Sequence, residues 1–399
     1  MNIGYEQLQP YPFERLAALR ERAAPATDEI INLSIGEPQH ATPPFIHDAL
    51  IEHLHLTAKY PATRGSEQLR ETIAAWLTKR FRLASGSVCA TTQVLPVNGT
   101  REALFAIAQC EIAAGSSKNL VALPNPFYQI YEGAALLAGG TPLYLNCPQE
   151  LGFQPDFAAV REPDWARVAL VYLCSPGNPS GTVIDEAQAT LLLELADRHD
   201  FLVVADECYS ELYAEESAPP PGLLEIASRT GRDDFSRCLV MHSLSKRSNA
   251  PGLRSGFVAG DAKVIERFFK YRTYHGGAMA LPVQHASIAA WSDEQHVIEN
   301  RRAYREKFDA VVPVVAQKLE VERPEAGFYL WPKLPLAGVE FAETLFREYG
   351  VLTLPGEFLS RAVKGHNPGH DRVRIALVAE LEQCSAAAQA LTELLERIG

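Results

Sequence analysis

Six short apolar runs, separated by turns and helix-like stretches, constrain the fold of this chain more than any other feature. Continuous apolar runs of this length are typical of strands that are buried on both faces of a sheet. Helical patterns between such strands imply that the strands are mostly parallel. The sequence therefore predicts an α/β fold with a mostly parallel central sheet. The six runs are residues 93–97, 119–124, 141–146, 167–174, 201–206 and 237–243.

Polar or turn-forming segments follow or end five of these runs. In open α/β sheets, ligands bind beyond the carboxyl ends of the strands, so we expect the five segments to lie together. They predict one site at that edge of the sheet. The segments are Asn98–Thr100, Asn125–Tyr128, Ser175–Gly181, Asp206–Tyr209 and Ser243–Lys246.

The chain changes character after about residue 290. Residues 293–320 predict one long amphipathic helix, with a kink expected at Pro313, and residues 328–334 and 371–379 predict strands of a smaller α+β domain. A length of 399 residues suits about two or three domains. We expect an N-terminal arm at 1–45 that packs on the small domain and forms part of it, a large domain at 46–290, and the small domain at 291–399.

Composition and charge argue against several classes of protein. The formal charge of −12 argues against nucleic acid as a general partner, although a local basic pocket for a small anion stays open. No apolar stretch approaches the roughly 18–20 uncharged residues that span a membrane. The N-terminus lacks the pattern of a secretory signal. Seven cysteines without a CxxC pair indicate a reducing compartment, so we expect a cytoplasmic protein.

The sequence contains none of the common metal or nucleotide motifs. Its eleven histidines include no HExxH and no Cys/His spacing that fits a set of metal ligands. GxGxxG and the phosphate loop GxxxxGK(S/T) are also missing, so the sequence predicts neither a dinucleotide nor a nucleoside triphosphate. We therefore expect no metal ion at the site.

Lys246 lies in a stretch, residues 242–256, that is rich in cations and hydroxyls. A lone lysine is most often a solvated surface residue. Here, however, Ser243 and Arg254 offer a hydroxyl and a guanidinium fork that suit a phosphate. Neighbouring cations and burial would leave the Lys246 amine partly neutral, as a Schiff-base lysine requires. The stretch is either an ordinary basic loop or an anion site beside a reactive lysine.

Asp206 ends an apolar run, where an unpaired carboxylate would be costly. It is either a cap or turn residue, or a carboxylate that holds a proton on a ring nitrogen. Tyr209 and the amide of Asn178 could donate to a ring oxygen. An asparagine in a Pro-Gly turn is usually just a turn residue, so that alternative stays open for Asn178.

Four further residues are candidates for the same site. Gly99 and Thr100 open a predicted helix whose N-terminal amides can bind an anion, although many helices begin this way. Tyr128 offers a flat face to a planar ring, or packs in the core. Arg374 lies within an apolar run, so it either extends to solvent or binds a carboxylate in a cleft.

Taken together, these motifs resemble the class I and II aminotransferases, which have PLP-dependent transferase fold type I and use pyridoxal 5′-phosphate (PLP). The likeness extends over essentially the full length, with the motifs in the family's order and spacing. It implies that the large domain binds PLP. The motifs are SPGNPSG (175–181), ADECYSELY (205–213), SLSKRSNAPGLRSGF (243–257) and RVRIA (372–376).

The resemblance implies a role for each candidate around the PLP ring. Lys246 corresponds to the Schiff-base lysine, which also moves a proton between the substrate and the cofactor. Asp206 corresponds to the partner of the pyridinium nitrogen. Asn178 and Tyr209 correspond to donors to the ring oxygen, and Tyr128 to the aromatic residue that stacks on the ring.

The resemblance also implies how the phosphate is held. Ser243, Arg254 and the amides of Gly99 and Thr100 correspond to the phosphate site. Tyr60 corresponds to a tyrosine that reaches the phosphate from the partner subunit. Such enzymes are usually homodimers with the active site at the interface, so a homodimer is implied.

For the substrate, Arg374 corresponds to the clamp of the α-carboxylate, and Gly36 and Asn178 to further contacts. Longer matches, such as PVNGTREALF (96–105), are similar to the bacterial N-succinyldiaminopimelate aminotransferases of lysine and diaminopimelate biosynthesis. The implied reaction transfers an amino group from N-succinyl-LL-2,6-diaminopimelate to 2-oxoglutarate.

Three alternatives stay open from the sequence. The first is an aminotransferase for another substrate, such as acetylornithine, aspartate or alanine. The second is a PLP β-lyase, and the third is a regulator that senses PLP. The partner of the second, distal carboxylate of the substrate is unassigned, with Arg247, Arg272 and Arg64 as candidates by residue type.

Overall fold

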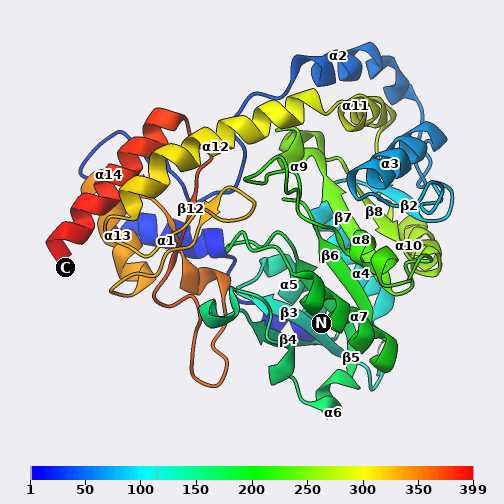
Figure 1. Cartoon of the computed structure of the whole chain (residues 1–399), viewed down its shortest axis with the longest axis horizontal. Coiled ribbons are helices and arrows are strands. Elements are labelled where there is room, and N and C mark those ends of the chain that lie inside the picture. The colour runs from blue at the N-terminus through cyan, green and yellow to red at the C-terminus, as the bar shows by residue number, and fades with distance from the viewer. Residues whose placement is uncertain (1, 114, 399) are drawn as a thin grey trace.

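The computed structural model describes residues 2–113 and 115–398 (Figure 1). At its centre lies a seven-stranded sheet, in which neighbouring strands are parallel except for the two pairs that β8 makes. This is the mostly parallel α/β fold that the sequence predicts. In spatial order the strands are β2 (Val94–Val97), β8 (Gly256–Gly260), β7 (Cys238–Ser243), β6 (Leu202–Asp206), β5 (Val168–Cys174), β3 (Leu120–Asn125) and β4 (Thr141–Asn146).

Six of these strands coincide with the six apolar runs, which confirms those predictions. The seventh strand, β8, escapes prediction because glycine stands at both of its ends and leaves an apolar run of only 257–259. β8 is antiparallel to both β2 and β7. Pairing with two buried neighbours, rather than local sequence pattern, therefore makes this segment a strand.

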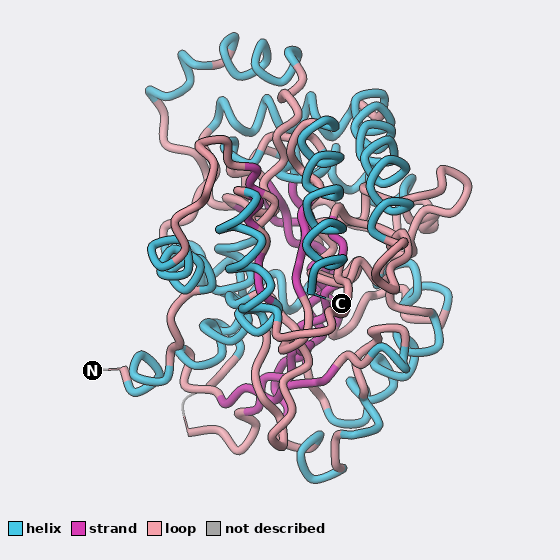
Figure 2. The backbone as a smooth tube through the Cα atoms, turned by 90° about the vertical axis from the view of Figure 1, so that its left-hand side faces the viewer, coloured by secondary structure: helices cyan, strands magenta, loops and turns pink. Residues whose placement is uncertain are grey.

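Alternate residues of the central strands pack against opposite layers of helices. In β6, Val203 and Ala205 join one core, whereas Leu202 and Val204 join the other. The two-residue period of a strand thus explains why these runs are apolar throughout. Figure 2 shows helices on both sides of the strands. One layer contains α3 (Glu67–Arg80), α7 (Glu186–His199), α8 (Leu223–Arg229) and α11 (Leu281–Ser292), and the other contains α4 (Thr100–Glu111), α5 (Gln129–Leu137) and α10 (Ala262–His275).

A second core is built from both ends of the chain. Leu16 and Leu19 pack there with Phe308 and Val311, so the first long helix and the later part of the chain share one core. Its helices are α1 (Pro12–Arg22), α12 (Gln295–Val315), α13 (Gly338–Tyr349) and α14 (Leu381–Ile398). Its strands form the antiparallel sheet β11 (Leu354–Pro355), β12 (Val373–Ala376) and β9 (Tyr329–Leu330), and the parallel pair β1 (Ile31–Asn32) and β10 (Val351–Leu352).

Helix α12 connects the two parts of the molecule. In Figure 1 it runs as a single yellow helix from the neighbourhood of α11 to that of α14. This confirms the predicted long helix, and Pro313 lies inside its bounds.

The N-terminal arm contacts both cores. Its helix α1 packs on the second core, whereas the preceding 3-10 helix η1 (Ile3–Gln7) lies against α5 of the central part. There the Asn2 side-chain amide donates a hydrogen bond to the carbonyl oxygen of Leu137 at 2.9 Å. The arm therefore reaches farther than the sequence suggests, and the domain bounds at 45 and 290 stay a prediction.

The remaining elements are short. They are α2 (Pro44–Glu52), α6 (Glu162–Trp165), α9 (Leu244–Arg247), η2 (Leu54–Ala58), η3 (Gln149–Leu151), η4 (Phe157–Ala159), η5 (Pro251–Leu253) and η6 (Gly356–Leu359). Within the described residues, no helix combines the length and the apolar character needed to cross a membrane.

Candidate active site

A cavity of about 510 Å³ lies beyond the carboxyl ends of the central strands. This volume is within the range of ~300–1,000 Å³ that is usual for ligand pockets. All five segments that follow or end strands contribute to the wall, and the small antiparallel sheet closes the other side. The predicted site residues that line the cavity are Gly36, Thr100, Tyr128, Asn178, Asp206, Tyr209, Ser243, Lys246, Arg254 and Arg374.

Lys246 is carried by α9, the single helical turn that directly follows β7. Its Nζ atom donates a hydrogen bond to the carbonyl oxygen of Gly36. Burial lowers the pKa of Lys246 to about 8, with Cys208 opposing this shift and Arg374 adding to it. A large share of the amine is therefore neutral at mildly alkaline pH, as nucleophilic chemistry requires.

Asp206 is the last residue of β6 and is buried. Its Oδ2 atom accepts a hydrogen bond from the Tyr131 hydroxyl at 2.8 Å, and its Oδ1 atom accepts one from the backbone N–H of Cys208 at 3.3 Å. Burial raises the pKa of Asp206, while the contacts with Cys208 and Tyr131 oppose that rise. The second contact is that of a turn residue, yet the same carboxylate also lines the cavity.

The hydroxyl groups of Tyr209 and Tyr329 share a hydrogen bond of 2.8 Å on the wall of the cavity. Both side chains are buried, and burial raises the pKa of Tyr209 well above its usual value. Tyr329 belongs to β9 of the small sheet, whereas Tyr209 follows β6 of the central sheet. The pair therefore joins the two sides of the cavity.

Arg374 also joins the two sides, because β12 projects its guanidinium into the cavity. Its Nη1 atom donates to Oδ1 of Asn178 at 2.9 Å, and its Nη2 atom donates to the carbonyl oxygen of Ser34 at 2.6 Å. Its buried Nε atom has no hydrogen-bond partner among the described residues. A buried N–H without a partner is costly, so this arginine is ready to accept an anionic ligand.

Gly99 allows Arg254 to approach the start of α4 closely. It has φ +81°, a conformation that glycine adopts readily, and a Cβ atom there would lie 2.3 Å from Nη2 of Arg254. Arg254 in turn donates to the carbonyl oxygens of Pro251 at 2.9 Å and Asn98 at 3.3 Å. Gly99 itself does not line the cavity, but it shapes the wall behind it.

Cys208 contacts the side-chain hydroxyls of both Thr100 and Ser243, two residues of the predicted phosphate site. Its sulfur is 3.0 Å from Oγ1 of Thr100 and accepts a hydrogen bond from Oγ of Ser243 at 3.6 Å. These contacts hold both hydroxyls on the same wall of the cavity as Arg254. Together, the three side chains form a cluster of donors that suits a phosphate.

Gly36 and Tyr60 have opposite surroundings. Gly36 packs so closely against Tyr329 that a Cβ atom would lie 1.8 Å from the tyrosine hydroxyl oxygen. Tyr60 is fully exposed and does not line the cavity of its own chain. The structure therefore brings Gly36 into the site and leaves Tyr60 outside it.

The three arginines considered for a distal carboxylate do not line the cavity. Arg247 is buried and pairs with Glu294 at 2.6 Å, and it also donates to backbone carbonyl oxygens of residues 290 and 293. Arg272 pairs with Glu102 at 2.7 Å, and Arg64 pairs with Glu266 at 3.2 Å. All three have carboxylate partners, so none is placed to bind a distal carboxylate in the cavity of this chain.

Several residues of the cavity wall escape sequence reasoning. Arg101 directly follows Thr100, and its Nε atom donates a hydrogen bond to the Tyr128 hydroxyl at 2.6 Å. Tyr131, one helical turn after Tyr128, orients Asp206. Two features of the sequence could have pointed to these residues. Arg101 lies at the predicted helix start, and Tyr131 is spaced three residues after Tyr128. The described residues contain no group of three or more His, Cys, Asp or Glu side chains that could hold a metal ion.

Comparisons with known proteins place these features in a family. The family model for aminotransferase class I and II matches residues 28–391. A solved aminotransferase of Neisseria meningitidis is 47% identical, covers 99% of this chain and 100% of its own, and has a TM-score of 0.95.

Two further proteins illustrate the range of substrates among similar proteins. OxyQ of Streptomyces rimosus, a 4-dedimethylamino-4-oxo-anhydrotetracycline transaminase, is 34% identical over 97% of this chain and 99% of its own. A solved structure from Thermus thermophilus, named a probable N-succinyldiaminopimelate aminotransferase, is 25% identical over 96% of this chain and 99% of its own, with a TM-score of 0.84. The chain belongs to the class I and II aminotransferases and is a PLP-dependent transaminase.

Proposed function

We propose that this transaminase transfers the amino group of N-succinyl-LL-2,6-diaminopimelate to 2-oxoglutarate, in lysine and diaminopimelate biosynthesis. The products are N-succinyl-2-amino-6-oxopimelate and glutamate. The sequence likeness to that subfamily and the similarity to the Thermus thermophilus structure support this substrate. The observation that carries the reaction is that Lys246, Asp206 and Arg374 line one cavity.

The donor cluster at the start of α4 fits the phosphate of PLP. Arg254 supplies a guanidinium, and Ser243 and Thr100 supply hydroxyls. The backbone amides of Gly99 and Thr100 open the helix, where the positive end of the helix dipole favours an anion. Because a Cβ atom at residue 99 would collide with Arg254, the glycine keeps this arrangement possible.

The residues around Asp206 fit the ring of PLP. Asp206 would hold the proton on the ring nitrogen, and its burial would strengthen that charge pair. Tyr209 and the amide N–H group of Asn178 would serve as donors to the ring oxygen, and Tyr128 would offer its face to the ring. When bound, PLP supplies an aldehyde for the amino group and a ring that withdraws electrons.

Lys246 and Arg374 act on the substrate side. Burial lowers the pKa of Lys246 to about 8, so its amine would be available to hold the aldehyde of PLP and to move a proton at the substrate Cα. Arg374 binds the α-carboxylate of both amino donor and oxo acceptor. Gly36 and Asn178 border this position. The amino donor and the oxo acceptor therefore bind one after the other, each with its α-carboxylate on Arg374.

We also propose a homodimer in which the partner's Tyr60 reaches the phosphate. The full exposure of Tyr60 supports this arrangement, because a solvated tyrosine of this kind suits an interface better than a monomer surface. The described cysteines are all free, which fits the cytoplasm as its compartment.

A second candidate is a transaminase for another amino donor. The similarity to OxyQ favours this alternative, because that protein is named for a tetracycline substrate. Acetylornithine, aspartate and alanine are the small-molecule alternatives. All these readings share the same cofactor residues, so only substrate assays separate them.

The experiment is a set of steady-state assays on the purified enzyme with 2-oxoglutarate as acceptor. We expect kcat/KM for N-succinyl-LL-2,6-diaminopimelate to exceed that for acetylornithine, aspartate and alanine by roughly tenfold or more, as differential binding of a longer substrate allows. Equal or higher kcat/KM for acetylornithine would refute the proposed substrate, while leaving the transaminase reaction intact.

A further inference from the structure

Four cationic side chains line the cavity, and the proposed function uses only three of them. Lys246, Arg254 and Arg374 serve the aldehyde, the phosphate and the α-carboxylate. The fourth is Arg101, which is solvent-accessible on the cavity wall. The lining contains two carboxylates, Asp206 and Glu37, and among the described residues neither forms an ion pair with Arg101. Arg101 therefore carries a positive charge in the cavity that nothing assigned so far uses.

Arg101 is held in place but keeps its terminal donors free. Its Nε atom donates to the Tyr128 hydroxyl at 2.6 Å, and its Cζ atom lies 5.8 Å from the centre of the Tyr128 ring. Its Nη1 and Nη2 atoms have no hydrogen-bond partner among residues 2–113 and 115–398. The Nη1 and Nη2 groups of Arg101, whose spacing matches the two oxygens of a carboxylate, are therefore oriented and available to a ligand.

The other arginines of the cavity differ in this respect. Arg254 uses both Nη atoms on backbone carbonyl oxygens. Arg374 uses both of its Nη atoms on Asn178 and Ser34. Within the described chain, Arg101 is therefore the arginine of this cavity whose terminal nitrogens have no protein partner.

We propose that Arg101 binds the second, distal carboxylate of dicarboxylic amino and oxo acids. This inference rests on the proposed function, and it deepens that function by naming the residue that selects the substrate class. Arg374 projects from the small sheet and Arg101 from α4 of the central part, so the two parts of the molecule each bind one carboxylate. Tyr128 positions Arg101 through its hydroxyl while its ring face stays available.

The main test compares two amino donors that differ only at the distal end. L-Glutamate carries a distal carboxylate, and L-norvaline has a methyl group in its place. In Arg101→Gln holoenzyme, we expect kcat/KM for glutamate to fall by about 10- to 100-fold, because a charge-assisted pair is lost. We expect kcat/KM for norvaline to change by less than about twofold, and Arg101→Lys to recover part of the loss, since lysine keeps the charge but not the fork.

A binding measurement checks the same site without turnover. Glutarate and pentanoate, which have no amino group, are titrated into the holoenzyme by calorimetry. We expect the wild type to bind glutarate more tightly than pentanoate, and Arg101→Gln to bind the two with equal affinity. Tyr128→Phe should weaken glutarate binding less than Arg101→Gln does, because the guanidinium stays but loses its orienting contact.

Arg161→Gln is the matched control, because it removes one cation from an exposed pair with Asp164, and Arg161 does not line the cavity. Arg161→Gln should change neither the preference for glutamate over norvaline nor the affinity for glutarate. An equal loss for glutamate and norvaline in Arg101→Gln, or unchanged preference for glutarate, would overturn the inference.

The two proposals fail in different ways. If N-succinyl-LL-2,6-diaminopimelate is not turned over while Arg101→Gln still loses glutamate selectively, the proposed substrate is wrong and the role of Arg101 stands. If that substrate is turned over and the preference for glutamate over norvaline does not depend on Arg101, the proposed substrate stands and the role of Arg101 is wrong.

Discussion

At the scale of single residues, the proposed chemistry depends on an amine that burial keeps partly neutral. Lys246 reaches the carbonyl oxygen of Gly36 inside the cavity, and burial lowers its pKa to about 8. Removing a cation from water disfavours the charged form, so the neutral, nucleophilic amine dominates above this pH. Surface lysines ordinarily reach that point only near ~10.4.

This pKa can be measured in the enzyme freed of PLP. We expect the labelling rate of Lys246 by an aryl fluoride, followed by peptide mass spectrometry, to rise with pH to a midpoint near 8. Other lysines in the same digest serve as internal controls, with midpoints near ~10.4. A midpoint for Lys246 close to that of the controls would contradict the burial argument.

At the scale of elements, the start of α4 depends on one glycine. In Gly99→Ala, the added Cβ atom would push away the guanidinium of Arg254, which is the mobile end of a flexible side chain. We therefore expect PLP affinity to fall by roughly tenfold or more, as the loss of a charged hydrogen bond implies. The dissociation constant of PLP, measured by absorbance or fluorescence titration, checks this.

Gly86→Ala is the matched control for this prediction. Gly86 has nearly the same positive φ, +78°, but no atoms lie within 4 Å of the position of its Cβ. Both variants place an alanine at a positive φ, and the Gly86 variant lacks the contact with Arg254. Equal loss of PLP affinity in both variants would rule out the contact as the cause.

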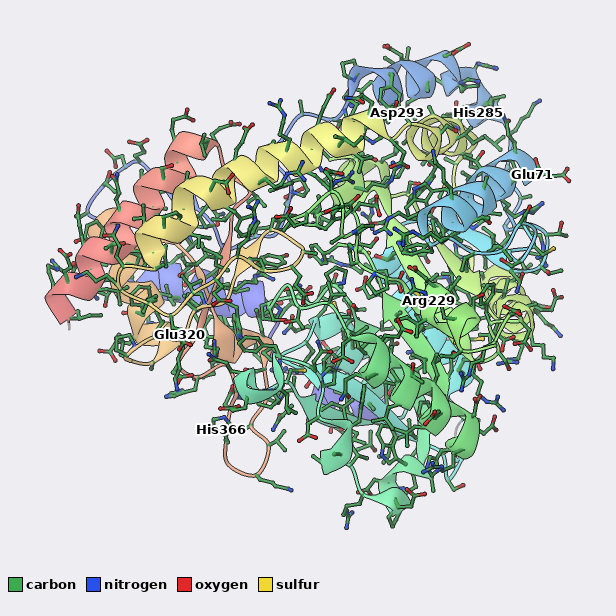
Figure 3. All side chains as sticks on the ribbon, viewed as in Figure 1. Glu71, Arg229, His285, Asp293, Glu320 and His366 are labelled. Carbon is green, nitrogen blue, oxygen red and sulfur yellow. The ribbon has the colours of Figure 1, made fainter. Side chains whose placement is uncertain are left out.

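A second prediction at this scale concerns Arg247, which ties α9 to the junction of α11 and α12. It pairs with Glu294 and donates to the carbonyl oxygen of Asp293, a residue labelled in Figure 3. Arg247→Met keeps an unbranched aliphatic side chain at this position but removes the guanidinium. The carbonyl oxygens of residues 290 and 293 then lose their hydrogen bonds to it. Water can solvate the partly exposed Glu294, so the main loss is that of the hydrogen bonds to the backbone carbonyl oxygens, and we expect stability to fall by about 1–3 kcal/mol.

Thermal unfolding of the holoenzyme measures this effect. Arg161→Gln, which breaks an exposed ion pair, should leave the transition unchanged. If Arg247→Met unfolds at the wild-type temperature but loses activity, then Arg247 serves catalysis rather than the attachment of α9.

At the scale of the whole molecule, the proposed homodimer would build each active site from residues of two chains. Lys246 lines the cavity, whereas Tyr60 of the same chain is exposed outside it. If the partner's Tyr60 completes the site, a hybrid of one Lys246→Ala chain and one Tyr60→Ala chain contains one site with both residues intact. We expect such hybrids to recover about half of the wild-type activity, with half of the sites filled by PLP.

The hybrid is prepared by co-expression of the two variants with different affinity tags, and each homodimeric variant is assayed beside it. If each chain used its own Tyr60, the hybrid would contain one site without Lys246 and one without Tyr60. Activity no higher than half that of the Tyr60→Ala homodimer would then contradict the shared site.

The sequence by itself determined the central architecture and most of the cavity wall. The six apolar runs become six strands, because a strand buried on both faces needs apolar residues throughout, and this requirement is visible locally. Since parallel strands end at the same edge of the sheet, the segments that follow them had to meet there. Ser243, Asp206 and Lys246 therefore could be predicted to lie in one site.

Only the tertiary structure decided the features that depend on contacts between distant segments. β8 is a strand because β2 and β7 flank it, and Asp206 is oriented by a tyrosine 75 residues away. By residue type the sequence offered Arg247, yet folding engages it with Glu294, whereas Arg101, which sequence reasoning missed, lines the cavity with free donors. A local pattern reveals which side chains carry charge, but whether a charge is already neutralised depends on the partners that folding brings to it.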